Sequence, residues 1–299
     1  MNQLELFTPQ LLPTITVFIV ILVFLGLNRK VTQRRTGKKL IAELSRRDNT
    51  AYGISYAGTT FSFIFVASTI MSTVEFHRFS AALGLLLFSG AFTLIALETG
   101  RFIHDKFILP RFNENEEINQ NNVAGAIIEA SSLFANALVI LALYAIFNKT
   151  TEHELNIWFF VLTWIIAQLI LLIVTRWREF MYSMSNQGSS FQNNLRFKNT
   201  AVAIRHGSWL VASAMLFRLI VGLVDYTEGE VVINVINILF FYSAFALPVF
   251  LFVFITNKIV LKRINSDSEI DHQDNIGIAC AEMAVILAIP SALGHLVQL

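Results

Sequence analysis

Long apolar runs separated by polar segments fill almost the whole chain. Each is close to the ~20 residues that a helix needs to cross ~30 Å of hydrocarbon. A helix also satisfies its own backbone hydrogen bonds in lipid, whereas a strand of a bacterial β-barrel would alternate over about ten residues. The pattern predicts an all-α, polytopic integral membrane protein with eight transmembrane helices, at Leu11–Leu27, Ala51–Met71, Ala81–Leu97, Val123–Phe147, Ile157–Val174, Ala201–Val224, Val231–Ile255 and Ile276–Leu293.

Composition agrees with a membrane protein. Hydrophobic residues make up 55% of the chain and charged residues 14%, against roughly 25% charged in an average soluble protein. The first apolar run has no basic stretch before it and no small-residue cleavage site after it, so we expect a retained helix rather than a signal peptide. Cys280 is the only cysteine, which excludes an intrachain disulfide and offers no zinc site.

The basic residues predict an orientation. The segments 28–48, 100–121, 176–198 and 257–274 hold 18 of the 22 Lys and Arg residues. By the positive-inside rule these four loops lie in the cytoplasm and both termini lie on the outer, periplasmic side of a bacterial inner membrane. Because these charges lie where topology needs them, we expect the lipid bilayer as a partner and no nucleic acid. The alternate connections hold only two basic residues beside acidic ones: Arg78, Lys149, Glu75, Glu152, Glu154, Asp225, Glu228 and Glu230.

A short motif recurs four times without gaps. It begins one residue before an asparagine and ends seven residues after it, in the segments 48–56, 121–129, 198–206 and 274–282. Each copy starts an even-numbered apolar run after a polar loop. The repeat predicts four parallel helical hairpins, 1–73, 74–149, 150–226 and 227–299, in one membrane domain or in two halves, 1–149 and 150–299. Four-fold and nested two-fold arrangements both remain open. The four asparagines are Asn49, Asn122, Asn199 and Asn275.

The motif Asn-x-Ala-x-Ala/Gly-Ile at the start of a transmembrane run resembles the bacterial inner-membrane family known as domain of unknown function family 350, the YjfL-like proteins. Gly277 replaces the usual alanine in the fourth copy. Members usually carry two such hairpins, so this chain resembles a tandem pair. The resemblance implies a fold and a membrane, and no particular reaction.

Small residues stand two and four positions after each asparagine, at Ala51 and Gly53 in the first copy and at equivalent positions in the others. Small residues let helices approach closely in lipid. We therefore expect the even-numbered helices at the centre of the bundle and the odd-numbered helices outside. The asparagine itself is expected mainly to cap its helix or to bond between helices.

The seventh residue after each asparagine is polar in all four copies. It lies on nearly the same helix face as the asparagine and roughly 10 Å deeper. If the four faces converge, they form an intramembrane polar ring, which Arg205 could partly neutralise. A static hydrogen-bond network that fixes helix pairing is the equally weighted alternative. The ring residues are Tyr56, Glu129, His206 and Glu282.

Two functions follow from these patterns. The first is a channel or transporter for protons or small cations, with the ring as transient binding groups and the asparagines at its entry. The alternative is a non-catalytic scaffold or complex subunit whose basic loops dock a soluble cytoplasmic partner, with self-association also open. No nucleotide-binding, hydrolase, metal or redox motif is found, so we expect no enzyme activity, no catalytic residue, no metal and no cofactor.

Overall fold

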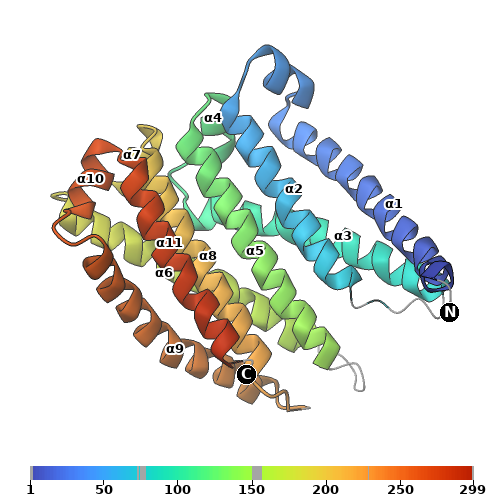
Figure 1. Cartoon of the computed structure of the whole chain (residues 1–299). Helices are drawn as coiled ribbons and strands as arrows, with labels where there is room; N and C mark the ends of the chain where they lie inside the picture. The colour runs from blue at the N-terminus through green and yellow to red at the C-terminus, as the bar shows by residue number, and fades with distance from the viewer. Residues whose placement is uncertain (1–2, 73, 75–78, 150–156, 228, 298–299) are drawn as a thin grey trace.

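The chain folds into long helices joined by short loops. Figure 1 shows the computed structural model, which describes residues 3–72, 74, 79–149, 157–227 and 229–297, and no strand occurs among them. Eight described helices are long and apolar enough to cross a membrane. They are α1 (Gln3–Thr36), α2 (Thr50–Met71), α3 (Phe79–Ile103), α5 (Val123–Lys149), α6 (Ile157–Ser185), α8 (Thr200–Leu223), α9 (Val231–Val260) and α11 (Ile276–Val297). This agrees with the predicted all-α membrane fold. Five of the charged residues named above for the alternate connections lie outside the described residues: Glu75, Arg78, Glu152, Glu154 and Glu228.

A short helical segment precedes the asparagine in each repeat. These segments are η1 (Ala42–Arg46), α4 (Glu114–Asn119, after the π-helical turn η2, His104–Ile108), α7 (Phe191–Arg196) and α10 (Ser266–Gln273). They lie at one end of the bundle, at the top of Figure 1. We call this end the motif side, because the four asparagines lie there.

The second, fourth, sixth and eighth spanning helices, α2, α5, α8 and α11, all start with the same backbone and capping geometry. The residue before each asparagine is left-handed, with φ of 51° at Asp48, 56° at Asn121, 64° at Lys198 and 51° at Asp274. The asparagine Oδ1 then accepts the backbone N–H three residues later, at 2.9 Å from Tyr52, 3.3 Å from Gly125, 2.8 Å from Val202 and 3.2 Å from Ile278. This is the geometry of an asparagine N-cap. It stops the preceding segment and starts the membrane helix in one step.

The four helices that start at a motif asparagine lie side by side in a row. In Figure 1 the order from left to right is α11, α8, α5 and α2, and the most extensive packing is between α5 and α8. α2 and α11 pack on α5 and α8 respectively and form no comparable interface with each other. The arrangement is therefore an open row rather than a closed four-fold bundle.

Burial follows this row. Within their membrane windows, 67% of α5 and 72% of α8 is buried, against 44% of α2 and 22% of α11. The prediction that the second, fourth, sixth and eighth spanning helices are all central is thus correct for α5 and α8. It is wrong for α2 and α11, which form the two edges. The other four spanning helices, α1, α3, α6 and α9, pack against the row. Several of their phenylalanine side chains are exposed, among them Phe18, Phe88 and Phe240, whereas Phe24 and Phe159 are buried.

Small residues let the helices of the row approach closely. A Cβ added to Gly58 of α2 would lie 2.5 Å from the Cβ of Ala130 on α5. A Cβ added to Gly207 of α8 would lie 2.7 Å from the Cβ of Ser131, also on α5. Both distances are shorter than carbon atoms tolerate, so a larger residue at either position must push two helices apart.

We predict that Gly207→Leu destabilises the bundle by about 1–3 kcal/mol through overpacking. The measurement is the thermal unfolding midpoint of the purified protein in detergent. Gly84→Leu on α3 is the matched control, because no described atom lies within 4 Å of the position its Cβ would take. Equal midpoints for the two variants would contradict the close approach of α5 and α8.

Candidate functional site

Each of the first three asparagines also binds the next repeat. The Nδ2 of Asn49 donates to the carbonyl oxygen of Ile118 at 3.0 Å, and that of Asn122 donates to the carbonyl oxygen of Leu195 at 2.9 Å. Asn199 donates to the carbonyl oxygens of Ile270 and Asp271 at 3.0 and 3.2 Å. One side chain therefore caps its own helix and ties it to the short segment of the following repeat.

The left-handed residue of the following repeat adds a second link. The side-chain oxygen of Asn121 accepts the N–H of Ala51 at 3.0 Å, and that of Asp274 accepts the N–H of Ala201 at 2.7 Å. The side chain of Lys198 has no acceptor atom, and its Nζ instead donates to the carbonyl oxygen of Gln120 at 3.4 Å. The motif is thus mainly a structural device, which agrees with the capping interpretation of the asparagines.

Glu129 lies at the centre of a closed polar cluster in the first half of the chain. Its side chain is fully buried, and its Oε1 lies 2.8 Å from Nε of Arg101 on α3 and 2.9 Å from Nη1 of Arg35 on α1. The Ser55 hydroxyl on α2 donates to its Oε2. Arg101 also contacts Glu98 and donates to the Thr59 hydroxyl at 2.6 Å. Four helices therefore meet at one carboxylate.

Glu282 lies in a second, separate cluster in the other half. Arg205 on α8 donates to both of its carboxylate oxygens, from Nε at 2.7 Å and from Nη2 at 3.0 Å. The Nη1 of Arg205 lies 3.0 Å from Oδ1 of Asp267 and 3.5 Å from Oδ1 of Asp271, both on α10. Arg205 therefore neutralises a glutamate, and it gathers three carboxylates in doing so.

The four ring residues do not meet. Glu129 and Glu282 belong to the two clusters just described. Tyr56 is half-buried at the α2 edge of the row, outside both clusters. His206 is fully buried, packs edge-on against Phe191 with ring centroids 5.0 Å apart, and has no hydrogen-bond partner for either ring nitrogen among the described residues. An open row keeps these side chains apart, because convergence would need contact between α2 and α11.

Sequence reasoning missed two arginines, Arg101 on α3 and Arg178 on α6. Arg101 and Arg178 both stand 21 residues before the asparagine of their repeat, Asn122 and Asn199. In the second repeat, Arg101 pairs with the glutamate seven residues after the asparagine. In the third repeat that position is His206, and Arg178 forms no ion pair among the described residues. The shared register of the two arginines is a sequence pattern that could have identified them.

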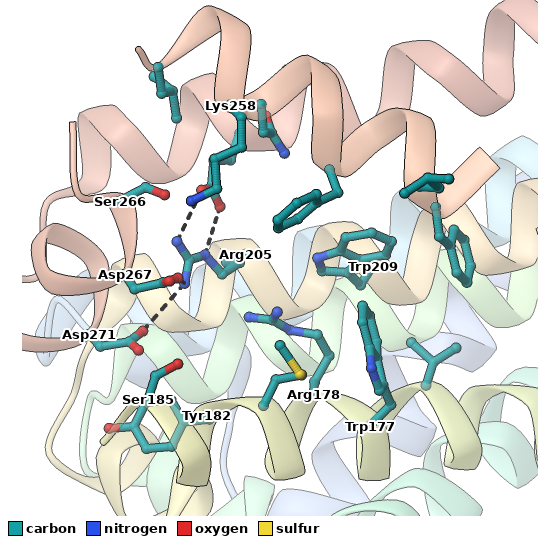
Figure 2. Close-up of a pocket in the computed structure, with 18 of the residues that line it drawn as sticks. Trp177, Arg178, Tyr182, Ser185, Arg205, Trp209, Lys258, Ser266, Asp267 and Asp271 are labelled. Carbon is teal, nitrogen blue, oxygen red and sulfur yellow. Dashed lines mark hydrogen bonds and ion pairs between the residues drawn. The ribbon is translucent and has the colours of Figure 1, made fainter. Parts of the chain in front are cut away.

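A cavity of ≈540 Å³ opens beside Arg178. It lies between α6, α8, α9, α10 and α11, and Figure 2 shows Arg178 between Arg205 and the rings of Trp177 and Trp209. The Nε of Arg178 has no hydrogen-bond partner among the described residues. The deeper wall is aromatic and aliphatic, and the motif-side wall is charged, with Lys258, Asp267 and Asp271.

Two carboxyl groups outside the membrane-spanning helices have shifted pKa values. Burial raises the pKa of Asp271 in α10, although the Asn186 amide, which donates to it at 2.8 Å, acts in the opposite direction. Burial likewise raises the pKa of Glu114 in α4, which lies 2.6 Å from Nδ1 of His104. No described group of three or more His, Cys, Asp or Glu side chains is placed to hold a metal ion.

Eight spanning helices in tandem hairpins define a multi-pass helical membrane protein. The model of the family described as Domain of Unknown Function (DUF350) matches residues 6–144, 86–221 and 152–296. The chain belongs to this family. The middle match overlaps the other two, so the family model recurs along the chain. No curated protein and no solved structure matches the chain.

We predict that Glu129→Ala destabilises the protein by about 3–5 kcal/mol, because it removes the fully buried carboxylate that pairs with Arg35 and Arg101. Chemical denaturation in detergent or in lipid nanodiscs measures the change. Tyr56→Phe is the control from the same motif position and should change stability by less than about 0.5 kcal/mol. A neutral effect of Glu129→Ala would show that the cluster around this glutamate contributes nothing to folding.

The double role of the asparagine predicts a graded series at Asn199. Asn199→Asp keeps the cap acceptor but loses the Nδ2 donor to the next repeat, whereas Asn199→Ala loses both. We expect the alanine variant to lose about 2 kcal/mol and the aspartate variant about half of that. Asn113→Ala removes a cap with no cross-repeat bond and serves as reference in the same thermal unfolding assay. A cost at Asn199→Ala no greater than at Asn113→Ala would refute the link between repeats.

Proposed function

We propose that this membrane protein binds an amphipathic molecule with an anionic group in the cavity beside Arg178. The observation that carries the proposal is the guanidinium of Arg178, which forms no ion pair with any described residue and lies at the boundary between an aromatic wall and a charged wall. Charged side chains buried in protein are normally paired. A guanidinium left without a carboxylate beside a cavity is suited to a phosphate or carboxylate of a ligand.

The walls of the cavity favour an amphiphile over a small polar solute. Trp177, Trp209 and Phe250 pack against one another, with the Trp209 ring perpendicular to the other two. Leu247, Leu251 and Phe254 extend this surface. An acyl chain or other apolar group would lie along it, while its anionic group would reach Arg178 and Lys258.

The acidic groups do not oppose this assignment. Asp267, Asp271 and Glu282 all contact Arg205, and none of the three forms an ion pair with Arg178 or Lys258 among the described residues. The positive-inside prediction places the motif side in the cytoplasm, which makes the inner leaflet or the cytoplasm the source of the ligand. Uptake of an amphiphile is also compatible with transport across the membrane.

Conduction of protons or small cations through a polar ring receives less support. A conducting carboxylate needs access to water, and Glu129 is enclosed by Arg35, Arg101 and Ser55. The scaffold alternative depends on the basic first loop, where Arg29, Lys30 and Arg34 lie at the end of α1. Arg35 is drawn from this loop into the Glu129 cluster and is not free for a partner.

Trp209 provides a direct test of the cavity. It lines the cavity and is 6% exposed, so Trp158→Phe/Trp164→Phe/Trp177→Phe leaves one buried reporter. Brominated amphiphiles of equal chain length with phosphate, phosphoethanolamine or quaternary ammonium heads are titrated into this variant in detergent. We expect saturable quenching, with half-saturation about tenfold lower for the phosphate-bearing amphiphiles than for the ammonium one.

Arg178→Gln in the same background should abolish the preference for phosphate. Arg176→Gln is the matched control, because Arg176 lies two residues away and pairs with Glu179 outside the cavity. Equal quenching by all three heads would reject the role of Arg178, and the absence of saturable quenching would reject the site.

A further inference from the structure

The junctions between successive repeats share their parts. In each, the helix of one repeat offers an asparagine amide and small residues, and the next repeat offers a carbonyl oxygen and an apolar residue. In the first two junctions the next repeat also offers a small helix position. The ninth residue after one asparagine packs on the eighth after the next: Gly58 on Ala130, and Ser131 on Gly207. The row therefore has a donor face on one side of each helix and an acceptor face on the other.

The donor face of α11 is unoccupied among the described residues. The second residue after the asparagine is fully buried in the first three repeats, at Ala51, Ala124 and Ala201, but Gly277 is exposed. Ala284, the ninth residue, is exposed as well, and so is Ala288 one turn further on. The fourth helix thus carries the same small-residue face as the others, with no described segment packed against it.

No described segment occupies the acceptor face of the first repeat either. The apolar residue of the short segment is 2% exposed at Ile118 and 0% at Leu195 and Ile270, whereas Leu44 is 39% exposed. Ala57, the eighth residue after Asn49, is exposed, with Phe61 58% exposed one turn below it. Asp48 has the left-handed backbone of Asn121 and Asp274, whose side chains accept the N–H of a preceding helix.

The two free edges lie on the same side of the row. At the end opposite the motif side, a cavity of ≈590 Å³ is lined by Phe65 and Thr69 of α2 and also by Ser291 and His295 of α11, with α5 and α8 as its floor. The row is therefore curved, and its edges flank one groove. Two such curved rows can face each other and join edge to edge at two places.

We propose that a second copy of this chain completes both edges, with α11 of each subunit packed on α2 of the other in a closed two-fold dimer. Each contact repeats the asparagine-to-carbonyl junction that is present three times within the chain. It buries Gly277 and Ala284 against Leu44 and Ala57 of the partner subunit, and Asp48 of the partner subunit accepts the Gly277 N–H. Lipid could cover the apolar residues but would offer no equivalent ordered acceptor to this N–H.

This interface is independent of the cavity beside Arg178 and predicts a specific contact. In a Cys280→Ser background, Ala57→Cys and Ala284→Cys are combined in one chain, reconstituted in nanodisc-sized or larger bilayers and oxidised with copper phenanthroline. We expect most of the protein to run as a covalent dimer. Each single-cysteine variant should stay monomeric on the gel, and a co-expressed mixture of the two singles should give dimer.

Other outcomes would overturn the proposal. Cross-linking of Ala284→Cys alone would indicate an α11–α11 contact, and a ladder beyond the dimer would indicate an open chain. Absence of cross-linking in the combined variant would indicate that lipid, and not a second copy of the chain, covers both edges.

Native mass spectrometry of the cysteine-free protein tests the same contact without a cross-link. We expect a dimer that Ala284→Phe converts to monomer, since the added ring blocks the small-residue face. Ala244→Phe on α9 is the matched control, because Ala244 is an exposed alanine on a helix that is not one of the two edges, and it should remain dimeric. A monomeric starting protein, or equal dimer in both variants, would overturn the proposal.

Discussion

The backbone N–H donors at the starts of α2, α5, α8 and α11 constrain the whole structure. A helix leaves its first N–H groups without partners, and here they lie at the membrane boundary, where an unsatisfied polar group is costly. One asparagine per repeat accepts such an N–H and uses its amide to bind the next repeat. Capping and repeat-to-repeat packing therefore depend on the same side chain, which is why the row of α2, α5, α8 and α11 begins at one level.

The charges are arranged on top of this row. In the first half, Glu129 is surrounded by arginines from α1 and α3, which closes the space between the helices. In the second half, Arg205 on α8 binds Glu282, and Arg178 on α6 is left beside a cavity. The two halves differ in where the guanidinium groups lie, and the cavity beside Arg178 lies in the second half.

The prediction from sequence was strongest for the spanning helices. Each apolar run predicted a helix that the structure contains, because helices in lipid must satisfy their own hydrogen bonds. The asparagines were correctly interpreted as helix starts, since left-handed and cap positions are local features. The polar ring was not formed, because a shared helix face does not determine whether four helices close into a circle or stand in a row.

The sequence by itself determined the class of protein, the helices and the tandem repeat, since length, hydropathy and capping act within a few residues. Only the tertiary structure decided that α5 and α8 are central while α2 and α11 form edges, that Arg101 rather than His206 meets Glu129, and that Arg178 faces a cavity. These features depend on contacts between residues far apart in the chain. Such contacts are set by how closely small residues let the helices approach and by which buried charges find partners.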